Sequence, residues 1–207
     1  MLTKIGLFFF SFFFVWVIGS LLEYFVHVFM HRRLLQGKIH TAHHKEANGQ
    51  GVWGEFVDYF LPGLPILVGF FAFDYFVLHA LWLGIGAIVG GIWFCAFSAY
   101  THQLSHERPE LVFWLRFPVH HIHHYHNMWH HNFGVTTLLW DRLFGTYKKV
   151  VWTPTKPVQL RNFFRIHWIS ANPLEEYHKH DDRDVPPARV PTLSLTTVPE
   201  QPQANER

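Results

Sequence analysis

The stretch HHIHHYHNMWHHNFG, residues 120–134, is the densest run of histidine in this chain of 207 residues. Seven of its fifteen residues are histidine, and the whole chain holds 18 histidines against 17 Lys and Arg together. Because imidazole is the commonest metal-binding side chain, this concentration indicates a metal centre. A lone cysteine, Cys95, excludes a disulfide framework and a thiolate cage, so nitrogen and oxygen must hold any metal.

The rest of the composition indicates a lipid environment. Phenylalanine occurs 22 times and aromatic residues make up 18% of the chain, which suits a lipid-facing surface or a greasy substrate channel. The formal net charge of +2 is too small to favour nucleic acid as a partner.

The first apolar segment, residues 5–30, is longer than the ~20 residues that a membrane-spanning helix needs. A cleaved signal peptide is the competing interpretation, since Lys4 precedes an apolar core. The run passes no small-residue cleavage site and continues into EYFVHVFMH, so one helix is expected to carry both the lipid span and the first histidines.

The second apolar block, residues 60–100, is too long for one span and predicts a helical hairpin. We expect Gly63 and Pro65 to open it and the turn to lie within residues 79–86. The fold class predicted is therefore all-α, with about three to four integral membrane helices beneath a histidine-rich cytosolic helical cap.

One membrane-embedded domain is expected over residues 1–180. Residues 181–207 contain too little apolar surface to order themselves and predict a disordered, Pro-rich tail.

Basic residues set the expected orientation. Four of them follow the first span, at positions 32, 33, 38 and 45, whereas only Lys4 precedes it. Positive charge stays on the cytoplasmic side, and a hairpin that enters from that side returns to it. All the histidine-dense segments are therefore expected at one membrane face, the cytosolic one.

The histidines fall into two patterns, H-x3-H and H-x2-H-H, and each occurs twice in the same order, once before the hairpin and once after it. The H-x3-H pairs are His27 with His31 and His102 with His106; the H-x2-H-H triplets are His40, His43, His44 and His120, His123, His124.

These spacings have a geometric meaning. Residues three or four apart are neighbours on one helix face, so H-x3-H aims two rings at one point. Adjacent histidines diverge by about 100° around the axis and can serve two metals side by side. Ten histidines so arranged predict a dinuclear centre. Imidazole suits Zn, Cu, Fe and Ni alike, but structural zinc is usually four-coordinate, so two irons are favoured, with zinc able to replace them in a structure.

Other pairings stay open inside residues 120–134. His121 with His124, or His126 with His130, also have helical spacing. We favour the triplet that repeats the earlier pattern. His121, His126, His130 and His131 are then spare, and we expect them to line the cap or to hydrogen-bond to the ligands. A single H-x3-H on an amphipathic helix would be weak support for a metal; the matched repeat makes the metal interpretation the stronger one.

The motifs EYFVHVFMH, HTAHH, HQLSH and HHIHH, followed by NFGVTTLLWDRLFGTY, resemble the membrane-bound fatty acid hydroxylase / sterol desaturase superfamily from Leu22 to Tyr147. The resemblance implies a non-haem di-iron enzyme that uses O2 as co-substrate, with two electrons, to hydroxylate or desaturate an unactivated C–H bond. It also implies that the ten histidines are the iron ligands and that a separate reductase, ferredoxin or cytochrome b5-like donor supplies the electrons. Basic residues around Arg32 and Arg33 are candidates to dock that donor, or are ordinary topology signals.

A metal-bound histidine usually donates its other N–H to a carboxylate, carbonyl or water. Glu23 lies one turn before His27, and its alternative role is to reach interfacial water. Asp141 could instead pair with Arg142 to fix the WDRLFGTY turn, and this is the role we favour for it. The candidates for the supporting role are Glu23, Asp58, Asn127, Asn132 and Asp141.

The expected function is hydroxylation of a long-chain lipid, either a fatty acid or a fatty acyl lipid. A carotenoid or sterol hydroxylase, or a desaturase, would use the same centre. A membrane metal transporter or metal buffer is the rival from another class, although a transporter should place its ligands near the bilayer midplane. The small size favours a bacterial inner membrane, or the endoplasmic reticulum if the source is eukaryotic.

Overall fold

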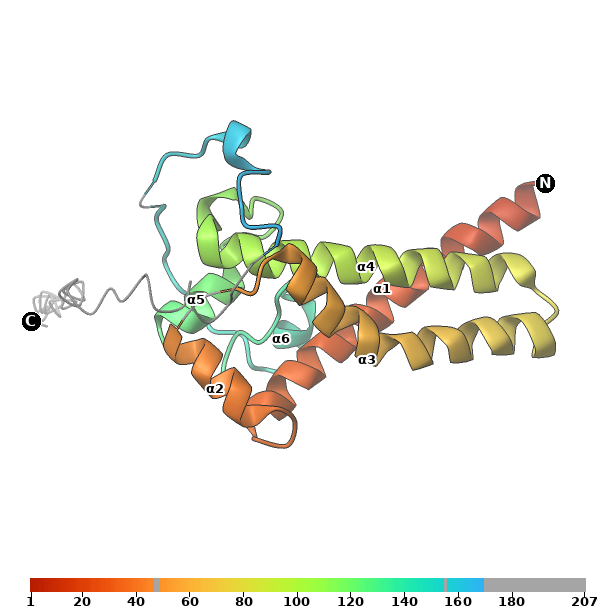
Figure 1. Cartoon of the computed structure of the whole chain (residues 1–207), viewed down its shortest axis with the longest axis horizontal. Coiled ribbons are helices and arrows are strands. Elements are labelled where there is room, and N and C mark those ends of the chain that lie inside the picture. The colour runs from red at the N-terminus through yellow and green to blue at the C-terminus, as the bar shows by residue number, and fades with distance from the viewer. Residues whose placement is uncertain (47–48, 155, 170–207) are drawn as a thin grey trace, which may run out of the picture.

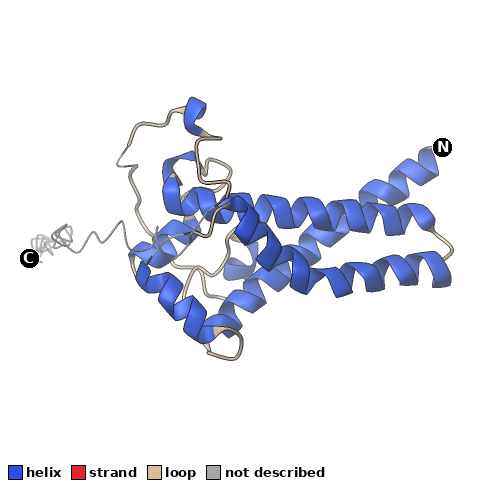
Figure 2. Ribbon diagram, in the orientation of Figure 1, coloured by secondary structure: helices blue, strands red, loops and turns tan. Residues whose placement is uncertain are grey.

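The computed structural model describes residues 1–46, 49–154 and 156–169, and every regular element in this part of the chain is helical (Figures 1 and 2). Three helices are long: α1 (Leu2–His31), α3 (Val52–Ala72) and α4 (Leu81–Glu107). The shorter elements are α2 (Gly37–Glu46), α5 (Val119–Tyr125), α6 (Leu139–Leu143), the π-helix η1 (Phe73–Val77) and the 3₁₀ turns η2 (Pro109–Leu111) and η3 (Leu160–Asn162). The predicted all-helical class is confirmed; the tail predicted for residues 181–207 lies outside the described residues.

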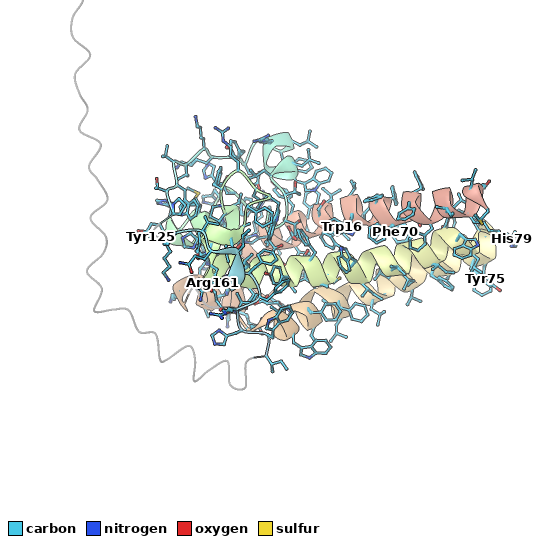
Figure 3. All side chains as sticks on the ribbon, turned by 90° about the horizontal axis from the view of Figure 1, so that it is seen from above. Trp16, Phe70, Tyr75, His79, Tyr125 and Arg161 are labelled. Carbon is cyan, nitrogen blue, oxygen red and sulfur yellow. The ribbon has the colours of Figure 1, made fainter. Side chains whose placement is uncertain are left out.

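Three segments of the described chain are long and apolar enough to cross a membrane: α1, α3 together with η1, and α4. They run along the long axis of the molecule, and α2, α5 and α6 gather at one end of them (Figure 1). The tip of the α3–α4 hairpin, marked by Tyr75 and His79, lies at the opposite end from Tyr125 (Figure 3). The predicted membrane helices with a cap at one end are confirmed.

The hairpin begins earlier than the sequence suggested. We expected Gly63 and Pro65 to open it, but α3 begins at Val52 and continues through Pro65. Proline is tolerated within membrane helices, where neighbouring groups satisfy the freed carbonyls. The helix begins instead directly after Gly51, whose φ of 81° is accessible chiefly to glycine. The turn comprises residues 78–80, at the near edge of the interval expected.

Helices α1 and α4 approach one another closely through glycine. A Cβ atom on Gly90 would lie 2.7 Å from the Phe12 carbonyl oxygen of α1. Near the same contact, the Ser11 hydroxyl of α1 donates a hydrogen bond of 2.7 Å to the Leu83 carbonyl of α4. Small residues let membrane helices pack by backbone contact, because lipid supplies no hydrophobic drive for their association.

This contact gives the first prediction. Gly90→Ala should destabilise the protein by roughly 1–3 kcal/mol, because the clash is with backbone that cannot move aside. Gly69→Ala on α3 is the matched control, since a Cβ there meets nothing within 4 Å. Thermal inactivation in detergent, followed by size-exclusion chromatography, measures both. Equal melting temperatures for the two variants would contradict the close α1–α4 packing.

Candidate metal centre

The four histidine patterns converge at the capped end of the molecule. The last turn of α1, helix α2, the end of α4 and helix α5 all meet there (Figure 1). Nine of the ten histidines form two groups whose ring nitrogens lie within 4.8 Å of one another. The first group is His27, His31, His40, His44 and His123; the second group is His43, His106, His120 and His124.

In the first group, Nε2 atoms face Nε2 atoms. The Nε2 of His31 lies 2.9 Å from that of His40, 3.1 Å from that of His44 and 2.9 Å from that of His123. The Nε2 atoms of His44 and His123 are 3.1 Å apart. Two imidazoles at right angles on one metal, with bonds of ~2.1 Å, would place their nitrogens about 3.0 Å apart.

The other nitrogen of two of these rings is held by the backbone. His27 Nδ1 lies 2.5 Å from the Phe133 carbonyl oxygen, and His123 Nδ1 lies 2.7 Å from the His131 carbonyl oxygen. A carbonyl oxygen only accepts, so in each neutral ring Nδ1 carries the proton and Nε2 presents a lone pair. The Nε2 of His27 is buried and has no hydrogen-bond partner. Lone pairs that converge in this way fit a cation and repel one another without one.

The second group has the same character. His106 Nε2 lies 3.1 Å from His120 Nε2. The His124 ring lies 4.5 Å from the rings of His43 and His120, centroid to centroid, and both of its buried nitrogens are without hydrogen-bond partners. The His124 ring also stacks at 4.0 Å on the ring of His44, which belongs to the first group. The two groups are therefore adjacent.

Each adjacent histidine pair is divided between the groups. His44 and His123 lie in the first group, whereas their neighbours His43 and His124 lie in the second. This is the division that the angular separation of neighbouring residues on a helix predicts.

His102 lies beside the second group without joining it. Its ring is 4.3 Å from the ring of His120, and its Nδ1 lies 2.9 Å from Glu55 Oε2. Both side chains are buried. A carboxylate behind a histidine in this way orients the ring and raises the basicity of its other nitrogen.

Glu55 was missed by the sequence reasoning, which named Asp58 one turn later. Asp58 is exposed and accepts a hydrogen bond from Gln50 Nε2 at 2.8 Å. Both acids lie in the first turns of an apolar helix, and that signal alone does not separate them. The buried one is the one that faces His102.

Glu23 supports the site indirectly. Its carboxylate accepts hydrogen bonds from the backbone N–H groups of Val135 and Thr136, at 2.9 and 3.0 Å, and from the Ser98 hydroxyl at 3.1 Å. The alternative in which Glu23 reaches interfacial water is wrong, because the residue is only 7% exposed. It ties α1 and α4 to the loop whose Phe133 carbonyl holds the His27 ring.

Asp141 holds the same loop from the other side. It is fully buried and accepts hydrogen bonds of 2.8 Å from the backbone N–H groups of Phe133 and Gly134. The expected pairing of Asp141 with Arg142 is wrong, since the Arg142 guanidinium lies over the Tyr147 ring at 5.2 Å. The carboxylate instead satisfies two N–H groups that would otherwise be buried without partners.

Asn132 joins two loops. Its Oδ1 accepts from the Lys148 backbone N–H and its Nδ2 donates to the Lys148 carbonyl, both at 2.9 Å. Its φ of 60° is a left-handed conformation that asparagine tolerates better than most residues. Asn132 therefore fixes the loop between the His131 and Phe133 carbonyls, both of which hold histidine rings.

The remaining histidines of α5 and its following loop lie outside the two groups. The His121 ring stacks on Tyr125. His126, His130 and His131 line a surface hollow of about 480 Å³, together with Trp129 and Lys148. Lining the cap is one of the two roles expected for them.

Burial keeps the rings neutral. Desolvation is the main cause that lowers the pKa of His40, His120 and His124, and repulsion between neighbouring imidazoles adds to it. Desolvation also lowers the pKa of His123. Burial lowers the pKa of His44 to about 4. Metal ligands must be deprotonated, so the unprotonated state that a metal requires is already the stable one at neutral pH.

Comparison with known proteins agrees with this geometry. The fatty acid hydroxylase family model matches residues 12–146, which include all ten histidines. The chain therefore belongs to the fatty acid hydroxylase family, whose name indicates lipid oxidation. No curated protein and no solved structure matches the chain significantly.

The contact between Glu55 and His102 gives the second prediction. Glu55→Gln should weaken metal retention about 10- to 100-fold, because the amide no longer supplies the negative charge behind the ring. Asp58→Asn, one turn along α3, is the control and should retain metal normally. Metal content after a chelator challenge measures the difference; equal losses from the two variants would contradict the role given to Glu55.

Acid sensitivity is the third prediction. An unfolded histidine takes up a proton near pH 6.5, whereas folded His44 does so near pH 4. As the pH falls from 6.5 to 4, the unfolded chain binds protons that the folded chain does not, and stability falls. The denaturation midpoint of the metal-free protein should therefore drop as the pH falls through this window. Well above pH 6.5, His44 is neutral in both states and should cause no further change. A flat profile from pH 7 to 4 would contradict the neutral cluster.

Proposed function

We propose that this protein uses two iron ions and O2 to hydroxylate an unactivated C–H bond of a long-chain lipid, either a fatty acid or a fatty acyl lipid. Membership of the fatty acid hydroxylase family supports a role in lipid oxidation. The single observation that carries the proposal is the convergence of histidine ring nitrogens into two adjacent groups at the end of the membrane helices.

The donor set fits iron. Imidazole ligands without thiolates suit first-row metals, and two neighbouring groups suit two ions. The first group would hold one iron, and the second group with His102 would hold the other. Bound there, the irons supply the O2 activation that side chains lack. The balance is one O2, two electrons and two protons, which give one hydroxyl on the lipid and one water.

The chain itself positions the ligands and excludes water. Backbone carbonyls of residues 131 and 133 fix two rings, and Glu55 fixes a third. The Phe133 ring lies 5.2 Å from the His31 ring, and the Trp129 ring lies 4.4 Å from it, so aromatic surface covers the first group. The first group lies at the ends of the apolar helices, and this location would let a lipid tail reach the group from the bilayer.

The proposed setting is a multi-pass membrane protein with the centre on the cytosolic side. The basic residues that follow α1 support this orientation. A bacterial inner membrane is the favoured location, with the endoplasmic reticulum as the eukaryotic equivalent. Electrons would come from a separate donor protein.

A desaturase, or a sterol or carotenoid hydroxylase, would use the same centre. Lipid profiling of cells with and without the protein separates these outcomes, because hydroxylation adds one oxygen and desaturation removes two hydrogens. A transporter is disfavoured, because the first group lies at the helix ends rather than along a path through the bilayer. About two tightly held metals per chain support the enzyme, whereas many weakly held ions would support a metal buffer.

The fourth prediction tests the centre. Replacing His123 and His124 together with alanine removes one ring from each group and should abolish both metal binding and lipid oxidation while leaving membrane insertion intact. His121→Ala, on the same helix but outside both groups, is the control and should keep both properties. Metal analysis and product mass spectrometry give the readout. Lipid oxidation at the parental rate in the double variant would sink the proposal.

A further inference from the structure

The surface hollow beyond α5 lies against the first histidine group. It is lined by His126, Asn127, Met128, Trp129, His130, His131, Lys148 and Val150. Of these, Trp129 is the only Trp, Phe or Tyr. Trp129 is half-buried, and its ring packs on the rings of His31, at 4.4 Å, and His44, at 5.5 Å. One conjugated side chain thus connects the surface with two members of the first group.

The hollow lies at the capped end of the molecule, where we expect water rather than lipid. Six of its eight lining residues, 126–131, directly follow Tyr125, which lies at the end of the molecule remote from the hairpin tip (Figure 3). A water-soluble protein can therefore approach this surface, whereas the spans α1, α3 and α4 would keep it away from the lipid-facing sides.

The charge at the hollow has one sign, because Lys148 is among its lining residues and no Asp or Glu is. The exposed Lys149 follows Lys148, whereas Asp141, the acid nearest to Lys148 in sequence, is fully buried and hydrogen-bonded. Lys148 lines the hollow and is exposed, and its backbone is fixed by Asn132. Such a surface attracts an acidic partner and speeds its association at low ionic strength.

We infer that this hollow is the docking site for an acidic one-electron carrier protein, and that Trp129 conducts its electrons to the metal centre. The carrier is of the iron–sulfur class, and each of two reduced carriers gives up one electron and leaves oxidised. The electron crosses the indole by tunnelling, so Trp129 itself undergoes no net redox change. Contact between conjugated rings favours this route, because electronic coupling falls steeply across a gap. The inference rests on the proposed function for the fate of the electrons, and it replaces the region around Arg32 and Arg33 as the docking site.

Docking can be tested without metal. The probe is a reduced or oxidised plant-type [2Fe–2S] ferredoxin, and the readout is its affinity for the metal-free, full-length protein in nanodiscs. Lys148→Glu should weaken binding about tenfold at low salt, and added salt should shrink the difference. Lys149→Glu makes the same charge change at the next residue, which is exposed but does not line the hollow, and should have a much smaller effect. Equal effects from the two variants, or no binding by the parent protein, overturn the docking site.

Conduction needs protein loaded with ferric iron, because each electron given up by a reduced ferredoxin would then reduce one Fe(III) to Fe(II). Trp129→Leu should slow anaerobic oxidation of saturating reduced ferredoxin by tenfold or more, while Trp129→Phe, which retains a conjugated ring, should restore most of the rate. Rates are taken at saturating ferredoxin and expressed per bound iron, so that a change in affinity or in iron content is not counted as slower conduction; recovery by phenylalanine then separates conduction from a merely structural role. Electron transfer at the parental rate in an iron-replete Trp129→Leu protein overturns the conduction. If the leucine variant loses iron, a Trp129→Phe protein that keeps iron but transfers electrons more than tenfold slower also overturns it.

These readouts separate the inference from the proposed function. Ferredoxin binding and its anaerobic oxidation require no lipid and no O2. A protein that accepts electrons through Trp129 but oxidises no lipid would contradict the proposed reaction and leave the electron route standing. Lipid oxidation that does not depend on Lys148 or Trp129 would contradict the electron route and leave the proposed reaction standing.

Discussion

The site depends on backbone carbonyls that accept hydrogen bonds from the Nδ1–H groups of two buried imidazoles. Where the carbonyls of His131 and Phe133 accept these hydrogen bonds, Nδ1 keeps its proton, and Nε2 has a lone pair and points inward. The geometry of the loop that holds residues 131–134 therefore decides whether the histidines meet as ligands or as ordinary buried polar groups. Three polar side chains fix this loop. Asp141 accepts from the N–H groups of residues 133 and 134, Glu23 accepts from residues 135 and 136 directly after it, and the Asn132 side chain ties the loop to Lys148.

The membrane helices supply the frame on which that loop rests. Glycine on α4 lets its backbone lie directly against α1, and Glu23 joins both helices to residues 135 and 136. Buried acid in an otherwise apolar helix is costly unless its oxygens are satisfied, and here several donors satisfy them. The acid is thus part of the joint between the lipid-embedded and the aqueous halves of the molecule.

Periodicity and spacing carried most of the prediction. Long apolar runs identified the spans, because length and hydropathy alone decide whether a helix can cross a bilayer. The repeat of H-x3-H and H-x2-H-H identified the histidines that meet, because helical spacing determines which side chains share a face. Spacing does not reveal which partner a carboxylate will find across the fold. Glu55 was therefore passed over for Asp58, and Asp141 was assigned to its neighbour Arg142 although its partners are backbone N–H groups. The predicted start of helix α3 was too late in the sequence, because proline was interpreted as a helix boundary, whereas a membrane helix tolerates it.

The division of neighbouring histidines has one more consequence. Helices α2 and α5 each place one ring in the first group and the adjacent ring in the second. A helix drawn into position by a cation in one group is thereby already rotated and seated for the other. If the groups bind metal, loading of one would be coupled to loading of the other through these two short helices, so we expect cooperative filling and few half-filled molecules.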